Sequence, residues 1–127
     1  MARILVIDDE ELVLATLNGI LGRAGYEVFT ARDGAQGLAT FERHAVDLVI
    51  TDIIMPEKEG IEIIGELRRQ RPNLPIIAIS GGGRMNKLDI LAIAEKLGAN
   101  EVFAKPVQSA ALCAAVARLL SRTLKRE

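Results

Sequence analysis

Five short apolar runs alternate with longer amphipathic stretches along this chain, and this alternation limits the possible folds more than any other feature. Three runs are almost wholly apolar, as expected for central strands that are covered on both faces: Ile4–Ile7, Val46–Ile50 and Ile76–Ile79. Two runs are more mixed and suit edge strands: Glu27–Thr30 and Glu101–Ala104. Strands that alternate with helical stretches in this way predict an α/β domain with a parallel sheet.

The segments between the runs have the apolar spacing and the punctuation of helices. Leu17 and Leu21 belong to one such apolar stripe. Gly25 and Gly98 are expected to end helices in a left-handed conformation, and Asp33 is expected to cap the start of one. Five strands joined by right-handed crossovers favour a flavodoxin-like, doubly wound sheet in the order 2-1-3-4-5 with five helices.

Length and composition narrow the functional classes. A chain of 127 residues fits one domain of the usual size, about 100–200 residues. The net charge is −1 and there are one Tyr, three Phe and no Trp, so we expect no direct nucleic-acid binding. Cys113 is the only cysteine, which fits a reducing compartment. Because no signal peptide or membrane-spanning run is apparent, we expect a cytoplasmic protein that does not insert into membranes.

Polar side chains follow four of the five predicted strands. The first strand ends at Asp8 and Asp9, the third at Asp52, the fourth at Ser80, and the fifth continues into Lys105. The carboxyl ends of parallel strands meet at one edge of a doubly wound sheet, where such folds bind their ligands. These five side chains are therefore predicted to lie close together.

Three carboxylates at one edge repel one another unless a cation lies among them. Oxygen ligands and room for water favour Mg²⁺, with Asp9 and Asp52 as direct ligands and Asp8 bound directly or through water. Lys105 supplies a positive charge and Ser80 a hydroxyl donor. A carboxylate nucleophile, a metal ion, an ammonium and a hydroxyl are the groups that phosphoryl transfer needs.

The residue spacing excludes two other functions, nucleotide binding by a glycine-rich loop and serine hydrolase activity. The run Gly81–Gly83 lacks the Lys-Ser/Thr ending of a nucleotide-binding P-loop and the later glycine of a dinucleotide fingerprint. A hydrolase elbow around Ser80 would need glycine where Ala78 stands and a nearby histidine. The only histidine, His44, is expected at the opposite end of the sheet. The glycines are interpreted as a loop beside the acidic site.

The chain resembles the receiver domain of bacterial two-component response regulators from Arg3 to about Leu120. The matching motifs are, in chain order, Val6–Glu10, Asp52–Pro56 with Gly60, Ser80–Gly81, and Gly98–Ala99 leading to Lys105–Pro106. The resemblance implies a receiver domain over residues 1–122 and a short tail over 123–127. It also implies a signalling module, not an enzyme acting on other substrates, that assists its own phosphorylation and dephosphorylation.

The resemblance also assigns roles to the residues of the site. Asp52 would be the phosphoacceptor, and Ser80 and Lys105 would contact the phosphoryl group. Asp8 and Asp9 would bind Mg²⁺ together with Asp52 and the backbone carbonyl of Ile54. The phosphoryl group would come from a histidine kinase or a histidine phosphotransfer protein, and the modified domain would relay it or bind a downstream target protein.

Some features depart from the family pattern and keep other hypotheses open. Val102 occupies the position of an aromatic switch residue, Val107 replaces a frequent phenylalanine, and the segment from Ser80 to Lys105 is longer than usual. A phosphate-independent interaction module on the same fold is the main alternative, and a Mg²⁺-dependent phosphatase is a weaker one. Leu14, Asn18 and Gly22 are expected to form the donor-docking face of the first helix, although scattered surface hydrophobicity explains them equally well.

Overall fold

A computed structural model describes residues 1–53, 59–80, 92, 96 and 98–125 of the chain. Five strands form one parallel sheet in the order β2-β1-β3-β4-β5, which confirms the predicted sheet and strand order. The strands are β1 (Arg3–Ile7), β2 (Glu27–Ala31), β3 (Leu48–Asp52), β4 (Ile76–Ser80) and β5 (Glu101–Ala104).

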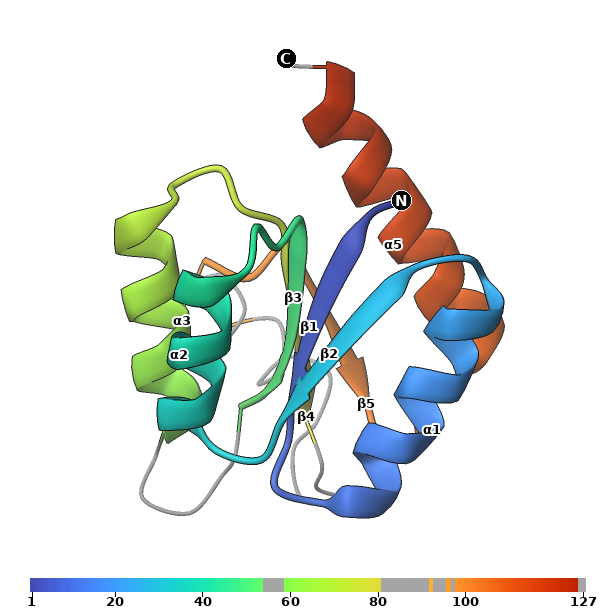
Figure 1. Cartoon of the computed structure of the whole chain (residues 1–127), viewed down its shortest axis with the longest axis horizontal. Helices are drawn as coiled ribbons and strands as arrows, with labels where there is room; N and C mark the ends of the chain where they lie inside the picture. Colours follow the sequence, from blue (N-terminus) through green and yellow to red (C-terminus); the bar gives the residue numbers. More distant parts are fainter. Residues whose placement is uncertain (54–58, 81–91, 93–95, 97, 126–127) are drawn as a thin grey trace.

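Helices cover both faces of the sheet (Figure 1). α1 (Glu11–Arg23) and α5 (Ser109–Lys125) lie on one face, and α2 (Gly34–Arg43) and α3 (Glu59–Gln70) lie on the other. The described part of the chain contains these four helices instead of the predicted five. The missing one is expected between β4 and β5, where most residues lie outside the described ranges. Within those ranges, no helix is long and apolar enough to cross a membrane.

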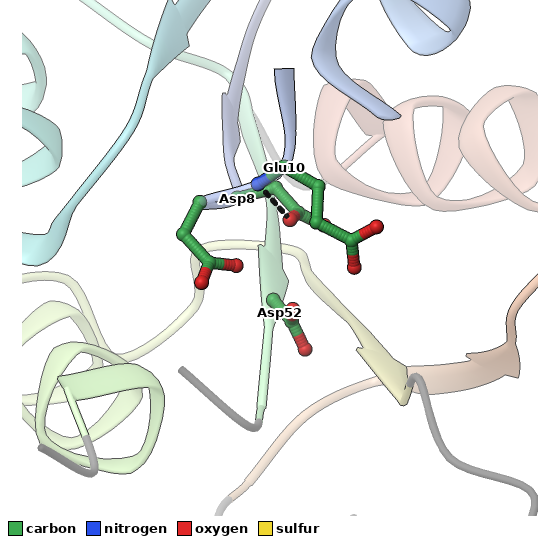
Figure 2. Close-up of side chains that lie close together, drawn as sticks. Asp8, Glu10 and Asp52 are labelled. Atoms are coloured by element: carbon green, nitrogen blue, oxygen red, sulfur yellow. Dashed lines mark hydrogen bonds between the residues drawn. The ribbon is translucent and has the colours of Figure 1, made fainter. Parts of the chain in front are cut away.

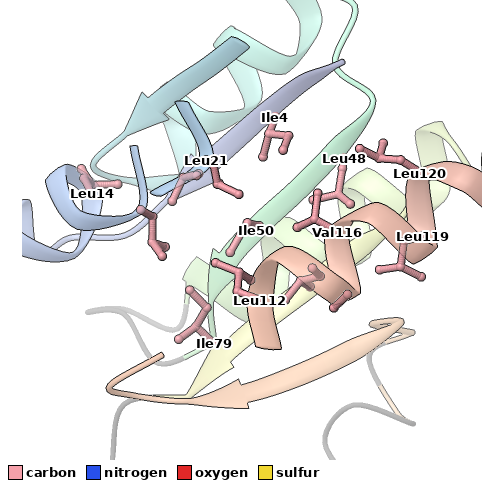
Figure 3. Packing of buried hydrophobic residues seen from close by; sticks show 14 residues of the cluster. Ile4, Leu14, Leu21, Leu48, Ile50, Ile79, Leu112, Val116, Leu119 and Leu120 are labelled. Atoms are coloured by element: carbon pink, nitrogen blue, oxygen red, sulfur yellow. The ribbon is translucent and has the colours of Figure 1, made fainter. Parts of the chain in front are cut away.

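The alternating side chains of the strands divide the core into two clusters. Ile4 and Val6 of β1 pack with α1 and α5, whereas Leu5 and Ile7 pack with α2 and α3. Figure 3 shows the first cluster, in which Val116 of α5 packs among residues of the central strands. The central strands β1, β3 and β4 are buried on both faces, so polar side chains gather where these strands end.

β3 begins and ends later than its apolar run suggests. The sequence predicts Val46–Ile50, but the ladder pairs Leu48–Asp52 with its neighbours. Val46 is buried yet precedes the strand, because apolarity reports burial and not strand pairing. The shift matters for function, since it makes Asp52 the last residue of β3 and fixes its position by the ladder.

The helix ends agree with the local sequence signals. Gly25, which follows α1, has a φ angle of 98°, a region that only glycine enters at little cost. Gly98 has a φ angle of 81°, but the helix that it is expected to end lies mostly outside the described residues. The Asp33 side chain caps α2 by accepting a hydrogen bond from the Gln36 amide at 2.8 Å. α5 continues to Lys125 and therefore includes residues 123–125 of the predicted tail. The domain boundary at residue 122 stays a prediction.

Arg68 of α3 fixes the approach to β5. Its guanidinium donates to the carbonyl oxygens of Leu74 at 2.7 Å and Gly98 at 2.6 Å. Burial lowers its pKa. The neighbouring Asn100 side chain accepts from the Ile76 amide at 2.8 Å, which ties the segment before β5 to the start of β4. These bonds set the position of β5 and hence of the lysine that follows it.

Candidate functional site

The register of the central strands brings two aspartates to the same edge. β1 and β3 pair with Ile7 opposite Thr51, so Asp8 and Asp52 come next on neighbouring strands. The Asp8 amide donates to the Ala31 carbonyl at 3.1 Å, which extends the ladder beyond β1. Asp8 is fully buried and Asp52 is 2 % exposed. Two carboxylates thus lie at the end of the most buried part of the sheet.

Ser80 and Lys105 reach this edge through the pairing of β4 with β5. Ser80 lies opposite Ala104, and the Lys105 amide donates to the Ser80 carbonyl at 2.9 Å. Ser80 is buried. The ladder therefore places Ser80 and Lys105 at the edge that carries the aspartates, as the sequence predicts.

Four carboxylates form the acidic cluster: Asp8, Asp9, Glu10 and Asp52. One oxygen from each lies within 4.8 Å of the others. Figure 2 shows Asp8, Glu10 and Asp52 in close-up. Asp8 and Asp52 are buried, whereas Asp9 and Glu10 are exposed. Glu10 was not among the predicted site residues, although its place in the acidic run after β1 was an available signal.

Lys105 is the counter-ion of this cluster. Its ammonium lies 2.8 Å from Glu10 Oε1, 2.9 Å from Asp8 Oδ2 and 3.0 Å from Asp52 Oδ2. Burial by itself would lower the pKa of Lys105, but the contacts with Glu10, Asp8 and Asp52 outweigh it and raise the pKa above its usual value. Lys105 therefore stays charged and holds together oxygens that otherwise repel one another.

The two oxygens of Asp8 have different surroundings. Oδ1 accepts a hydrogen bond from the Glu10 amide at 2.9 Å. Oδ2 is buried and has no hydrogen-bond donor among the described residues, since Lys105 approaches it as an ion pair outside hydrogen-bond geometry. Burial raises the pKa of Asp8 above its ordinary value, and this outweighs the opposing contacts with Glu10 and Lys105.

The donor set of the cluster fits a hard cation. All four groups offer carboxylate oxygens, which are the ligands that such ions prefer. The buried Asp8 Oδ2 lacks a hydrogen-bond donor, so an ion would satisfy an oxygen that the described chain leaves unsatisfied. The exposed carboxylates of Asp9 and Glu10 leave the cluster open to water on one side. Asp8, Asp9 and Asp52 could hold an ion together.

The described chain thus brings together four of the predicted side chains, those of Asp8, Asp9, Asp52 and Lys105, and places the backbone of Ser80 beside Lys105. One predicted ligand stays untested. The carbonyl of Ile54 and the glycines of Gly81–Gly83 lie outside the described residues. His44 is the C-cap of α2 and stacks on Phe29 with ring centroids 4.2 Å apart. It follows α2 and precedes β3, at the amino edge of the sheet, away from the acidic cluster.

The predicted outward face of α1 is wrong at one position. Leu14 is only 7 % exposed and packs in the core with Leu17 and Leu21. The buried stripe of α1 therefore consists of Leu14, Leu17 and Leu21, and the neighbouring Val13 is half-buried. Leu12, at 78 % exposure, is the large apolar side chain that α1 presents to solvent, two residues after Glu10 in the chain.

The two sides of β5 separate Val102 from Phe103. Val102 is partly buried against the cluster formed with α2 and α3. Phe103 is partly buried against the other cluster, on the side of α1 and α5. The only aromatic residue of β5 therefore faces away from the position that Val102 occupies, as the alternation of side chains predicts.

Comparison with known proteins agrees with this architecture. The family model described as the response regulator receiver domain matches residues 4–117. The alkaline phosphatase synthesis transcriptional regulatory protein PhoP of Bacillus subtilis is 34 % identical over 122 residues, which are 95 % of this chain and 49 % of that protein. The transcriptional regulatory protein GlrR of Escherichia coli is 35 % identical over 91 % of this chain and 25 % of its own length. The chain therefore spans about half or less of these relatives.

Solved structures with the same fold cover the whole chain. A response regulator receiver domain protein from Clostridium thermocellum is 35 % identical with a TM-score of 0.89, and the match covers 100 % of both chains. A CheY-like receiver domain protein from Methanospirillum hungatei is 28 % identical with a TM-score of 0.88 over 100 % of this chain and 99 % of its own. These matches favour the phosphoacceptor hypothesis over the phosphate-independent module. The chain belongs to the response regulator receiver domain family.

Proposed function

We propose that this receiver domain is a signalling switch in which Asp52 accepts a phosphoryl group. The observation that carries the proposal is the position of Asp52, a buried carboxylate with the Lys105 ammonium 3.0 Å away and Asp8 and Asp9 in the same cluster. A buried carboxylate among other acids has no evident structural use and is costly to keep. A reaction at Asp52 explains why the fold holds it there.

The transfer step requires little covalent chemistry from the protein. A carboxylate oxygen of Asp52 attacks the phosphorus of a phosphohistidine donor, and a P–O bond forms as the P–N bond breaks. The bonding electron pair stays on the donor imidazole, and the product is an aspartyl phosphate. Positioning and charge stabilisation supply most of the catalysis in such reactions, and this site provides both.

Lys105 and Ser80 would stabilise the transferred group. The Lys105 ammonium lies beside Asp52 and can neutralise the charge of a phosphoryl oxygen. Ser80 is held by the pairing of β4 with β5 next to Lys105, and its hydroxyl can donate to a second oxygen. New contacts with these two residues would favour the phosphorylated state and so alter the domain surface.

Mg²⁺ is the ion that this site fits best. Asp8, Asp9 and Asp52 would hold it, with the Ile54 carbonyl as a further predicted ligand. Few carboxylates and access to water suit Mg²⁺, which keeps several of its waters, better than Ca²⁺. When bound, it neutralises phosphoryl oxygens and aligns them for in-line transfer.

The proposed partners are a phosphodonor and a target. The donor would be a histidine kinase or a histidine phosphotransfer protein, and α1 would contact it through the exposed Leu12, two residues after Glu10 in the chain. The target would be a downstream protein, or an output domain as in relatives whose names describe transcriptional regulation. The proposed location is the cytoplasm, where such donors act.

Intact-mass analysis after incubation with acetyl phosphate and Mg²⁺ tests the proposal. We expect one phosphoryl adduct that maps to Asp52, is absent from Asp52→Asn, and is lost when Mg²⁺ is chelated. Asp33→Asn is the matched control, because asparagine caps a helix as well as aspartate does. An adduct that persists in Asp52→Asn would contradict the assignment.

A further inference from the structure

Glu10 has a side chain that its own helix does not use. It is the N-cap residue of α1, with φ −92° and ψ 114°, but its side chain makes no capping hydrogen bond. Glutamate is not among the residues preferred at this position, where Ser, Thr, Asp and Asn dominate. Instead its carboxylate contacts the Lys105 ammonium at 2.8 Å, across 95 positions of the chain. A role outside helix capping explains this choice.

Glu10 connects two members of the site. Its amide donates to Asp8 Oδ1 at 2.9 Å, shown as the dashed line in Figure 2, while its carboxylate accepts from Lys105. The hydrogen bond to Asp8 fixes the backbone of Glu10, and the contact with the ammonium fixes the position of its carboxylate. Glu10 thereby helps to place Lys105 over the cluster before any phosphoryl group is present.

The Lys105 ammonium is surrounded by three carboxylates. It donates hydrogen bonds to Glu10 and Asp52 and forms an ion pair with Asp8 Oδ2, all within 3.0 Å. A phosphoryl oxygen on Asp52 that binds Lys105 therefore competes with these carboxylates for a single positive charge. Which of Glu10, Asp8 and Asp52 loses the ammonium depends on how exposed each carboxylate is to water.

Glu10 is the acceptor that is easiest to displace. Its side chain is 60 % exposed, so water can replace the ammonium at its carboxylate. The side chains of Asp8 and Asp52 are 0 % and 3 % exposed, so losing the ammonium would leave a buried charge without its partner. Exposed ion pairs also contribute little free energy.

From these contacts we propose that Glu10 is a positioning residue. It holds Lys105 in the unmodified domain and is displaced when a phosphoryl group on Asp52 takes the ammonium. The inference rests on the proposed function of Asp52 and adds to it a competition between Glu10 and the phosphoryl group for Lys105. Glu10 would therefore set how tightly the site holds that group.

Beryllofluoride, a stable mimic of the phosphoryl group on aspartate, measures this competition. With Mg²⁺ saturating for each variant, Glu10→Gln should bind beryllofluoride about two- to fivefold more tightly than the unaltered protein, which is the range expected for one exposed ion pair. Glu11→Gln is the matched control, since it removes the same charge from a neighbour that pairs with Arg32. The affinity can be read by ¹⁹F NMR.

The ¹⁵Nζ resonance of Lys105 gives a second, independent measurement. In the unmodified protein it should shift in Glu10→Gln and not in Glu11→Gln. In the beryllofluoride adduct it should coincide in the unaltered protein and Glu10→Gln, because Glu10 no longer contacts the ammonium.

Three results would overturn the role of Glu10. These are an unchanged or weaker affinity in Glu10→Gln, an equal gain in Glu11→Gln, and Lys105 resonances that still differ in the adduct. If the unaltered protein does not bind beryllofluoride at all, the proposed function of Asp52 fails as well. Failure of the inference alone and failure of the function are thus distinguishable.

Discussion

The Lys105 ammonium lies 3.0 Å from Asp52 Oδ2, although the two residues are 53 positions apart. Asp52 ends β3 and Lys105 follows β5, and the intervening strand β4 pairs with both. The contact is therefore set by two strand registers and not by local sequence. It places one cation between buried carboxylates whose repulsion it offsets.

Removal of this cation should destabilise the domain. Lys105→Met leaves Asp8 and Asp52 buried without their counter-ion, and we expect a loss of about 3 kcal/mol in the free energy of unfolding. Urea unfolding at neutral pH with a chelator present measures it. Adding Mg²⁺ should restore part of the stability, because a bound cation replaces the missing charge.

Arg32→Met is the control for this change. Arg32 and its partner Glu11 have side chains that are 61 % and 75 % exposed, so their separation should cost less than about 1 kcal/mol. Equal losses in Lys105→Met and Arg32→Met would show that burial of the cluster does not matter.

Asp8 should make stability depend on pH. Its pKa is raised above the ordinary 3.8 because burial disfavours the charged form. The folded protein thus binds this proton more readily than the unfolded chain, so the contribution of Asp8 to stability is full below pH 3.8 and is lost as the pH rises through the raised pKa. Unfolding measured across this range without divalent ions should show the decline.

Asp8→Asn should remove that decline and raise stability at neutral pH. The amide oxygen can still accept from the Glu10 amide, so the local backbone contact is kept. Mg²⁺ should then stabilise the unaltered protein more than Asp8→Asn. Asp9→Asn is the control, because it removes a carboxylate that is exposed instead of buried. If Asp8→Asn and the unaltered protein have identical pH profiles of stability, Asp8 is not the group responsible for the decline.

A substitution on the exposed face of α1 should slow phosphoryl transfer from a protein donor but not from a small-molecule donor. Leu12→Glu places a charge at a side chain that is 78 % exposed, two residues after Glu10 in the chain. Phosphoryl transfer from a phosphohistidine protein should slow about tenfold or more, as for loss of an interface hot spot, relative to transfer from acetyl phosphate. Ala39→Glu, at an exposed position of α2 on the other face of the sheet, is the positional control. Equal slowing with both donors would contradict a docking role.

Close packing of α2 on β1 predicts that alanine substitutions at two glycines change the stability of the domain in opposite directions. A Cβ at Gly37 would come within 2.5 Å of Ile7 Cδ1, and Ile7 is fully buried. Gly37→Ala should therefore cost about 1–3 kcal/mol through overpacking. A Cβ at Gly19 in α1 meets nothing within 4 Å, so Gly19→Ala should stabilise the domain by about 0.5–1 kcal/mol. Thermal unfolding of the two variants provides the test.

The predictable parts of the fold were those in which a local pattern has one physical meaning. Apolar runs identified the central strands, and Gly25 and Asp33 marked helix ends correctly, because their conformations depend on neighbouring backbone alone. The bounds of β3 were wrong, since a ladder between strands decides where pairing begins. The inward direction of Leu14 was missed for a similar reason: helix rotation depends on the sheet beneath it.

The sequence by itself determined which groups the site would contain: Asp8 and Asp9 after the first strand, Asp52 after the third, and Ser80 and Lys105 after the last two. Only the tertiary structure decided how they interact. The contact of Glu10 with Lys105 spans 95 positions, and the lack of a hydrogen-bond donor at Asp8 Oδ2 among the described residues depends on how the surrounding elements pack. Strand order follows from patterns that repeat along a chain, whereas ion pairs and pKa shifts follow from distance and burial, which exist only once the chain has folded.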